Sequence, residues 1–248
     1  MTAKTRKYLL LGFVFFAAFC MYHKFSPYKV LFAGHYDKIW AHRVNSLEKQ
    51  KSAVMYFDGL ELDLVYVQDS NILDVNHPPA ESIHLNFDTY IRNLDISEKP
   101  SLWLDIKNLT IENDSLIFDR ISSVLEKYNC PIDKVLIESL NPEALHRFVK
   151  AGFKSSYYVN PKLKKMSESE AENELKYINS VLRNNPKLVL SSNYTDYERL
   201  SKAFPNKDLY LWAISSDFNK DFFKIRKLLG DNKVKVVLAR YNAFNGNR

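Results

Sequence analysis

The sequence predicts a (β/α)8 TIM barrel preceded by a single N-terminal hydrophobic segment. From Lys38 onward, short apolar runs rich in β-branched and aromatic residues alternate with longer segments of helical period. This alternation is typical of parallel strands joined by crossover helices. The chain has 248 residues, 46% of them hydrophobic, which suits one domain with one substantial core. A doubly wound open sheet is the competing arrangement.

Eight strands and seven helices are expected in order along the chain. The strands are expected at residues 39–43, 60–67, 102–107, 135–139, 155–159, 188–192, 209–214 and 234–240. The helices are expected at residues 46–57, 87–93, 114–128, 142–151, 168–184, 195–203 and 218–229. Several helices open with capping residues, namely Asn141 before Pro142, Ser167 with Glu170, and Thr195 with Glu198. The longest connection without a clear element, residues 68–86, is expected to form a loop over the barrel mouth.

Residues 1–26 differ in composition from the rest of the chain. Basic side chains precede an uncharged run over residues 8–22. The run has the length that separates a signal-peptide core from a short membrane span, and it contains no small-x-small cleavage motif. An uncleaved membrane anchor is therefore favoured over a cleaved signal peptide. The basic residues would hold the N-terminus in the cytoplasm and place the domain, residues 27–248, outside it, in a periplasmic, lumenal or extracellular space.

The charge and cysteine content exclude some classes of partner and cross-link. The formal net charge is +6, but four of the 35 Lys and Arg residues and no acidic residue lie in residues 1–26. The remaining domain is nearly balanced, and it shows no zinc-finger spacing, lysine-rich arm or glycine-rich phosphate loop. No nucleic-acid partner is expected. Because Cys20 lies in the expected anchor, Cys130 has no partner for a disulfide within the domain.

Carboxylates line one face of two neighbouring predicted strands. Period-2 alternation places Glu61 and Asp63 on one face of the second strand, with leucines on the other. The third strand repeats the pattern, with Asp105 and Lys107 opposite its aliphatic side chains. In a barrel the aliphatic faces suit the surrounding helices, so the acids would point inward and converge from adjacent strands.

Such inward acids need a partner, because an unpaired buried charge costs several kcal/mol. A divalent cation, which prefers oxygen ligands, would hold Glu61, Asp63 and Asp105 together. The alternative is neutralisation by Arg or Lys. Two roles are open to Lys107, as that structural partner or as a contact for an anionic substrate, and the spacing does not separate them.

Two histidines and an arginine are expected near these acids. His42 and Arg43 end the first strand, and His77 lies in the connection after the second strand. Two histidines beside an acidic metal site can divide the work of a general acid and a general base. The planar guanidinium of an arginine can bind two phosphate oxygens at once.

The order and spacing of these residues resemble those of the glycerophosphodiester phosphodiesterase superfamily, whose members are PLC-like barrels. The resemblance rests on His42-Arg43, Glu61-x-Asp63, His77 fourteen positions after Asp63, and Asp105-x-Lys107. A closer resemblance is to the menorin group of that superfamily, through Ala41-His42-Arg43-Val44-Asn45-Ser46, His77-Pro78-Pro79 and Leu104-Asp105-Ile106-Lys107. The resemblance covers most of residues 38–241, and only the first three predicted strands match the motifs in detail.

The resemblance implies a metal-dependent phosphodiesterase and a role for each matching residue. By this resemblance, His42 and His77 are the acid/base pair, Arg43 binds phosphate, Lys107 adds positive charge beside it, and Glu61, Asp63 and Asp105 bind Ca²⁺ or Mg²⁺. Attack on phosphorus would come from a substrate hydroxyl, giving a cyclic product, or from water.

Two positions depart from the pattern of the superfamily. Val44 stands where phosphodiesterases usually have a glycine after His-Arg, and Asp105 stands where a glutamate is more usual. The shorter Asp105 would shift the metal or its preference, so the specificity for a diester is less well defined than the site itself.

The expected ligand is a phosphodiester-containing small molecule, lipid or glycan, and two other functions compete with its cleavage. One is a non-catalytic, membrane-tethered barrel that binds a phosphorylated or glycan ligand. The other is a glycoside hydrolase that uses Glu61 with Glu138, which would leave the two histidines and Arg43 without a role. Tyr157, Tyr158 and Trp212 are expected to pack in the barrel or at its mouth, where an aromatic ring can stack on a sugar or glycerol.

Overall fold

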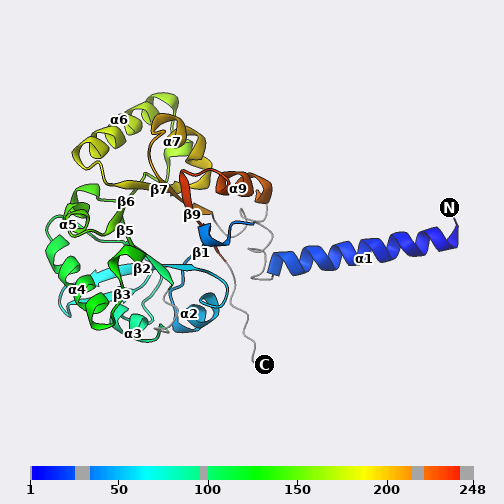
Figure 1. Cartoon of the computed structure of the whole chain (residues 1–248), viewed down its shortest axis with the longest axis horizontal. Coiled ribbons are helices and arrows are strands. Elements are labelled where there is room, and N and C mark those ends of the chain that lie inside the picture. The colour runs from blue at the N-terminus through cyan, green and yellow to red at the C-terminus, as the bar shows by residue number, and fades with distance from the viewer. Residues whose placement is uncertain (1, 26–33, 95–99, 214–220, 241–248) are drawn as a thin grey trace.

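Eight parallel strands form a closed barrel in the computed structural model, which describes residues 2–25, 34–94, 100–213 and 221–240 (Figure 1). The ring follows the order β1-β9-β8-β7-β6-β5-β4-β2, and pairing of β1 with β2 closes it. The predicted barrel is therefore confirmed, and the open-sheet alternative is wrong, because an open sheet has no pairing between its two edges.

The strands of the barrel agree with the predicted ones to within about two residues at each end. They are β1 Ile39–Ala41, β2 Gly59–Val67, β4 Ser101–Ile106, β5 Val135–Ser139, β6 Lys154–Tyr158, β7 Val189–Asn193, β8 Leu209–Ala213 and β9 Val234–Ala239. The first strand ends before Arg43, because that residue adopts a positive φ of 54° and leaves the extended conformation. Residue 214, the predicted end of the seventh expected strand, lies outside the described residues.

Helices surround the ring of strands, as Figure 1 shows. The α-helices are α1 Ala3–Phe25, α2 Leu47–Ala53, α3 Phe87–Arg92, α4 Asp114–Lys127, α5 His146–Lys150, α6 Glu168–Asn184, α7 Tyr197–Ala203 and α9 Phe222–Leu229. Short 3-10 turns are η2 Tyr36–Lys38, η3 Ile132–Lys134, η4 Pro142–Leu145, η5 Leu163–Lys165 and η6 Tyr194–Asp196. Residues 218–220 of the last predicted helix lie outside the described residues.

Of the predicted caps, only the one at Ser167 has the expected bonds. Ser167 and Glu170 form a complete capping box at the start of α6. At Thr195 the chain forms the 3-10 turn η6 instead, with the backbone N–H of Thr195 donating to the side chain of Asn193, and α7 begins only at Tyr197. The side-chain oxygen of Asn141 accepts no capping bond, and its Nδ2 donates to the carbonyl of Leu109 at 2.6 Å.

The alternation along the strands separates two cores. Outward-facing aliphatic side chains such as Leu62 and Leu104 join the large core between the barrel and the helices. Inward-facing side chains fill the barrel itself, where Trp103 and Tyr210 pack edge to face with their centroids 5.5 Å apart. The inner packing closes the lower barrel, so the space for a ligand is left at the C-terminal ends of the strands.

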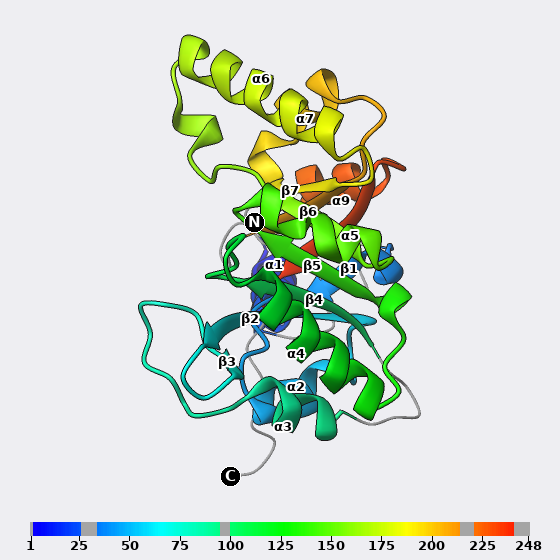
Figure 2. The same cartoon turned by 90° about the vertical axis from the view of Figure 1, so that its left-hand side faces the viewer.

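An additional strand, β3 Ile72–Val75, pairs with β2 in antiparallel fashion outside the ring. The connection of residues 68–86 was expected to have no element, so this part of the prediction was wrong. The strand has only four residues, and alternation of polar and apolar side chains is hard to recognise over so short a segment. Figure 2 shows β2, β3 and the loop that follows them projecting from one end of the barrel. The hairpin returns the chain to β2, where the backbone N–H of Asn76 donates to the carbonyl of Asp63 at 3.1 Å.

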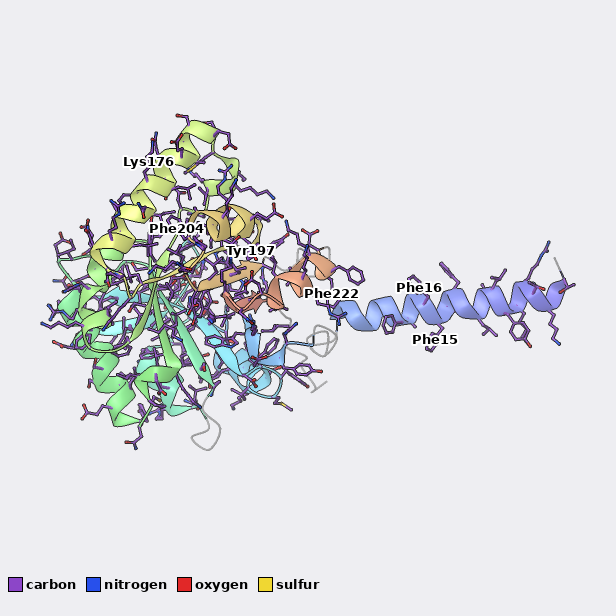
Figure 3. All side chains as sticks on the ribbon, turned by 45° about the horizontal axis from the view of Figure 1, so that its top comes forward. Phe15, Phe16, Lys176, Tyr197, Phe204 and Phe222 are labelled. Atoms are coloured by element: carbon purple, nitrogen blue, oxygen red, sulfur yellow. The ribbon has the colours of Figure 1, made fainter. Side chains whose placement is uncertain are left out.

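The N-terminal helix α1 stands away from the barrel in Figure 1. Its apolar side chains are largely exposed, with 77% of Phe15 and 63% of Phe16 accessible to solvent (Figure 3). No helix among the described residues has both the length and the apolar character needed to cross a membrane. The anchor predicted over residues 1–26 stays a prediction.

Candidate metal centre and cavity

A cavity of about 240 Å³ opens at the C-terminal ends of the strands, where barrels of this class hold their ligands. Its lining contains every residue that the sequence singled out for chemistry, namely His42, Arg43, Glu61, Asp63, His77, Asp105 and Lys107. It also contains Glu138, Tyr158, Trp212, Leu238 and Arg240. The tertiary structure therefore brings the candidate residues together, while their roles stay predictions.

Three buried carboxylates form the centre of the cavity. Glu61, Asp63 and Asp105 are 2%, 1% and 7% exposed, and each offers an oxygen atom within 4.8 Å of the others. The strand register explains this convergence, because Asp63 and Asp105 are direct partners on β2 and β4 and Glu61 lies two positions before Asp63. Hard divalent cations prefer this kind of all-oxygen donor set.

Backbone and side-chain donors hold the carboxylates in place. Lys107 Nζ contacts Asp105 and also lies 2.5 Å from Asp63 Oδ1. Asn45 Nδ2 donates to Asp63 Oδ2 at 2.6 Å, and the side-chain Oδ1 of Asn45 accepts from the Asp63 backbone N–H at 3.0 Å. Lys107 is thus a structural partner of the acids, which is one of the two roles expected for it. Because it also lines the cavity, it can contact an anionic ligand there as well.

The electrostatics of the cluster show an excess of negative charge. Burial raises the pKa of Glu61 well above its usual range, and the nearby Asp63 and Asp105 raise it further. Burial also raises the pKa of Asp105, although Lys107 acts in the opposite direction. Burial disfavours the charge of Lys107, but the attraction of Asp105, Asp63 and Glu61 is stronger, so the pKa of Lys107 is raised. Lys107 contacts two of the three carboxylates directly, and added positive charge would stabilise their ionised forms.

The two histidines lie on different sides of this cluster. His42 Nε2 lies 3.7 Å from Glu61 Oε2, and its other ring nitrogen, Nδ1, is buried without a hydrogen-bond partner. Burial, aided by the charge of Arg43, lowers the pKa of His42 to about 3, so its ring is neutral at neutral pH. His77 is more open, with 31% of its side chain exposed, and its Nε2 lies 4.0 Å from Asp63 Oδ1.

Arg43 connects one histidine to the acids through a strained backbone. Its φ of 54° is uncommon for a residue with a side chain, and such strain is often found at functional sites. In this conformation its backbone N–H donates to Glu61 Oε2 at 2.5 Å. Its guanidinium donates to His77 Nε2 at 2.8 Å, so that this nitrogen is the acceptor of the pair. Arg43 therefore couples β1, β2 and the loop after β3.

Lys49 of α2 supports the strand end that bears His42 and Arg43, and the sequence analysis missed this residue. Its Nζ donates to the carbonyl oxygens of His42 at 2.7 Å and of Arg43 at 2.5 Å. Burial lowers the pKa of Lys49 to about 8. No motif marked Lys49, since its function depends on where α2 packs. Asn45 was visible in the sequence only as part of a motif, without a role.

The cavity residues on β5, β6 and β8 entered the sequence analysis only through its alternatives, Glu138 as a carboxylate of a glycoside hydrolase and Tyr158 and Trp212 as aromatic residues of the barrel or its mouth. Glu138 is 3% exposed, and burial raises its pKa well above the usual range, with a further contribution from Asp105. Tyr158 and Trp212 face the cavity, with their rings 6.2 Å apart and nearly perpendicular at 89°. Period-2 alternation could have placed all three side chains inward, but their convergence depends on the closed ring.

Comparison with known proteins finds the same architecture at low sequence identity. No family model and no curated protein matches the sequence. A glycerophosphodiester phosphodiesterase from Parabacteroides distasonis superposes with a TM-score of 0.58 at 14% identity, covering 82% of this chain and 92% of the other. A protein from Agrobacterium tumefaciens assigned as a glycerophosphoryl diester phosphodiesterase gives a TM-score of 0.57 at 15% identity, with coverages of 82% and 92%. One from Galdieria sulphuraria gives 0.55 at 16% identity, with coverages of 83% and 94%. The chain therefore has the barrel fold seen in these glycerophosphodiester phosphodiesterases.

Proposed function

We propose that this protein is a metal-dependent phosphodiesterase of the glycerophosphodiester phosphodiesterase type. The observation that carries the proposal is the convergence of the Glu61–Asp63–Asp105 cluster with two histidines, Arg43 and Lys107 in one cavity at the mouth of this fold. A barrel that only bound a ligand could keep the carboxylates for a cation, but it would not need two histidines beside them. The fold is shared with known phosphodiesterases, which supports the reaction class.

The proposed metal ligands are Glu61, Asp63 and Asp105, and their chemistry fits Ca²⁺ or Mg²⁺. All three donors are carboxylate oxygens, and burial together with their mutual repulsion raises the pKa values of Glu61 and Asp105, so a bound cation would stabilise their ionised forms. A bound divalent cation would stabilise the charge that develops on the non-bridging phosphate oxygens. The aspartate at position 105, shorter than the usual glutamate, still reaches the cluster because β4 is in direct register with β2.

The remaining polar residues are proposed to bind phosphate and to transfer protons. Arg43 and Lys107 would contact the phosphate oxygens, and Arg43 would exchange its bond to His77 for one to the substrate. His42 and His77 would form the acid/base pair. One removes the proton of the attacking water or substrate hydroxyl as its oxygen bonds to phosphorus, and the other protonates the departing oxygen.

The closer assignment, to the menorin group, is proposed on the motifs around His42, His77 and Asp105. Within this group the ligand would be a phosphodiester on a small molecule, a lipid or a glycan. We also propose that the domain acts outside the cytoplasm and is attached to a membrane through residues 1–26. The basic residues before the apolar run and the exposed aromatic side chains of α1 support this location.

The experiment that tests the reaction uses the full chain with an aryl phosphodiester and with glycerophosphodiesters, in Ca²⁺, in Mg²⁺ or in EDTA. We expect turnover that requires the divalent cation and falls by at least about 100-fold in His42→Ala and in Glu61→Gln. The controls are His146→Ala and Glu143→Gln, two exposed positions on the η4–α5 segment outside the cavity. These controls should keep wild-type rates.

Calorimetric titration with Ca²⁺ or Mg²⁺ separates the remaining possibilities. Cation binding that depends on Glu61, without turnover of any substrate, would favour the non-catalytic binding protein. The absence of both turnover and cation binding would refute the assignment of the metal centre.

A further inference from the structure

A second group of polar side chains in the cavity has no role in the proposed phosphodiester chemistry. Glu138 of β5, Tyr158 of β6 and Trp212 of β8 line the same cavity as the three acids. In the ring, β6 lies across from β1 and β8 lies across from β4, whereas β5 pairs directly with β4, with Glu138 in register with Asp105. The second group therefore continues the cavity lining from the β4 side of the metal centre over β5, β6 and β8.

Two atoms of this group are buried and have no hydrogen-bond partner. Glu138 Oε2 accepts a bond from Trp103 Nε1 at 3.0 Å, whereas Glu138 Oε1 has no partner. The Ser191 hydroxyl donates to the carbonyl of Tyr157 at 3.3 Å, and it also lies near enough to the Glu138 carboxyl to oppose the rise in the pKa of that group. Trp212 Nε1 is also buried and without a partner. Buried polar atoms are nearly always paired in native proteins, so an acceptor and a donor left open in a cavity indicate a ligand that supplies the missing bonds.

Glu138 is not a member of the metal centre. The oxygen atoms that approach one another within 4.8 Å belong to Glu61, Asp63 and Asp105 alone among the described residues. Glu138 is anchored instead by the indole of Trp103, deep in the inner core. Its open oxygen is thus available to a part of the ligand other than the phosphate.

The open atoms define the chemistry of that part of the ligand. The indole N–H of Trp212 can only donate, and a carboxyl oxygen can accept, so the pair suits a group that both donates and accepts, as hydroxyls do. A cationic group would leave the indole N–H unused, and an anionic group would be repelled by the acids. The rings of Tyr158 and Trp212, nearly perpendicular at 89°, form an apolar corner beside the polar atoms. A ring that bears hydroxyls on its edge and C–H groups on its faces matches both features.

We propose that Glu138, Trp212 and Tyr158 form a subsite for a neutral, hydroxyl-bearing ring, either a sugar or a cyclic polyol. Glu138 Oε1 accepts from one hydroxyl, Trp212 Nε1 donates to a hydroxyl oxygen, and the aromatic corner packs against the C–H face. The attachment of this ring to a phosphodiester rests on the proposed function, whereas the recognition of the ring does not.

The test measures binding of neutral probes to the full chain in EDTA, by saturation-transfer NMR and calorimetry. Methyl glucoside and myo-inositol are the ring probes, glycerol is the acyclic probe, and choline is the cationic probe. We expect saturable binding of at least one ring probe, tighter than that of glycerol or choline. Glu138→Gln and Trp212→Phe, which change single polar groups but retain most of the side-chain shape, should each weaken it about tenfold. The matched control, Glu143→Gln, lies outside the cavity and should bind like the wild type.

Three results would overturn the subsite. These are no saturable ring binding, a preference for choline, and ring binding that neither variant weakens. Circular dichroism melts verify that each variant is folded, and if Glu138→Gln does not fold, Trp212→Phe decides the question. Ring binding without turnover of any phosphodiester would retain the subsite and refute the proposed reaction, whereas metal-dependent turnover without ring binding would do the reverse.

Discussion

When no metal ion is bound, Lys107 is the side chain that neutralises the buried acids by direct contact. It contacts both Asp63 and Asp105, and only 20% of its side chain is exposed. Removing one partner from a buried ion pair leaves an uncompensated charge, at a cost of about 3–5 kcal/mol. The presence of this lysine explains how the acids remain folded together before any metal binds.

We predict that Lys107→Met lowers the free energy of unfolding by about 3 kcal/mol in EDTA, because two buried aspartates lose their cation. Ca²⁺ or Mg²⁺ should restore part of this loss, since a divalent cation would take over the neutralisation. Urea denaturation in both conditions measures the effect. Lys127→Met, which breaks an exposed ion pair with Asp88, is the matched control and should have a much smaller effect. A loss at position 107 that a cation does not reduce would contradict a shared metal centre.

His42 makes stability depend on pH in a defined direction. Its pKa is 6.5 in the unfolded chain and is lowered to about 3 by burial in the folded protein. Between these values the unfolded chain binds one proton more than the folded protein does, so this residue makes stability fall as pH falls below 6.5.

The difference in unfolding free energy between wild type and His42→Ala isolates this contribution. From pH 6.5 to pH 5, the wild type should lose about 2 kcal/mol relative to the variant, measured in EDTA by urea denaturation. The constant effect of the missing ring cancels in the comparison across pH. A difference that does not change with pH would show that His42 is protonated equally in both states, and would contradict its burial as a neutral base.

At the scale of the elements, the contact between β1 and β2 sets the position of the residues that follow each strand. Gly59 opens β2 beneath the indole of Trp40 on β1, and a Cβ atom at position 59 would lie 2.1 Å from Trp40 Cδ2. Only glycine allows this approach. His42 and Glu61 each lie two residues further along these strands, so the packing of Trp40 on Gly59 fixes their relative height in the barrel.

We predict that Gly59→Ala destabilises the domain by about 1–3 kcal/mol, because the indole of Trp40 must move. Trp40→Leu in the same chain should recover part of the loss, since the smaller side chain relieves the contact. Thermal unfolding of the single and double variants tests this. Gly12→Ala provides a control, because no atom lies within 4 Å of the added Cβ. If the loss of stability in the double variant equals the sum of the losses in the two single variants, the two residues do not share the contact.

At the scale of the whole molecule, the barrel domain and residues 1–26 are separate parts with separate proposed roles. The barrel, its cavity and its acids are complete without α1, which contributes no residue to the cavity lining. The exposed apolar surface of α1, with Phe13 69% and Phe15 77% accessible, calls for a covering partner. A lipid bilayer is the partner proposed above.

We predict that the full chain sediments with membranes and that the chain lacking residues 1–26 does not. Protease added outside intact cells or spheroplasts should digest the domain if it faces outward, while a cytoplasmic marker protein stays intact. Recovery of the full chain in the soluble fraction would contradict attachment through this segment. Protection of the membrane-bound domain from external protease would contradict only the proposed orientation.

The sequence by itself determined the barrel and the inward direction of Glu61, Asp63, Asp105 and Lys107, because the period of two along a strand is a local property. The tertiary structure alone decided the rest. It revealed β3, which leads His77 back beside Asp63, and the packing of α2, which brings Lys49 to the end of β1. It also brought Glu138, Tyr158 and Trp212 to one wall of the cavity. These contacts join residues far apart in the chain, and the closure of the ring, rather than any local pattern, sets the distances between them.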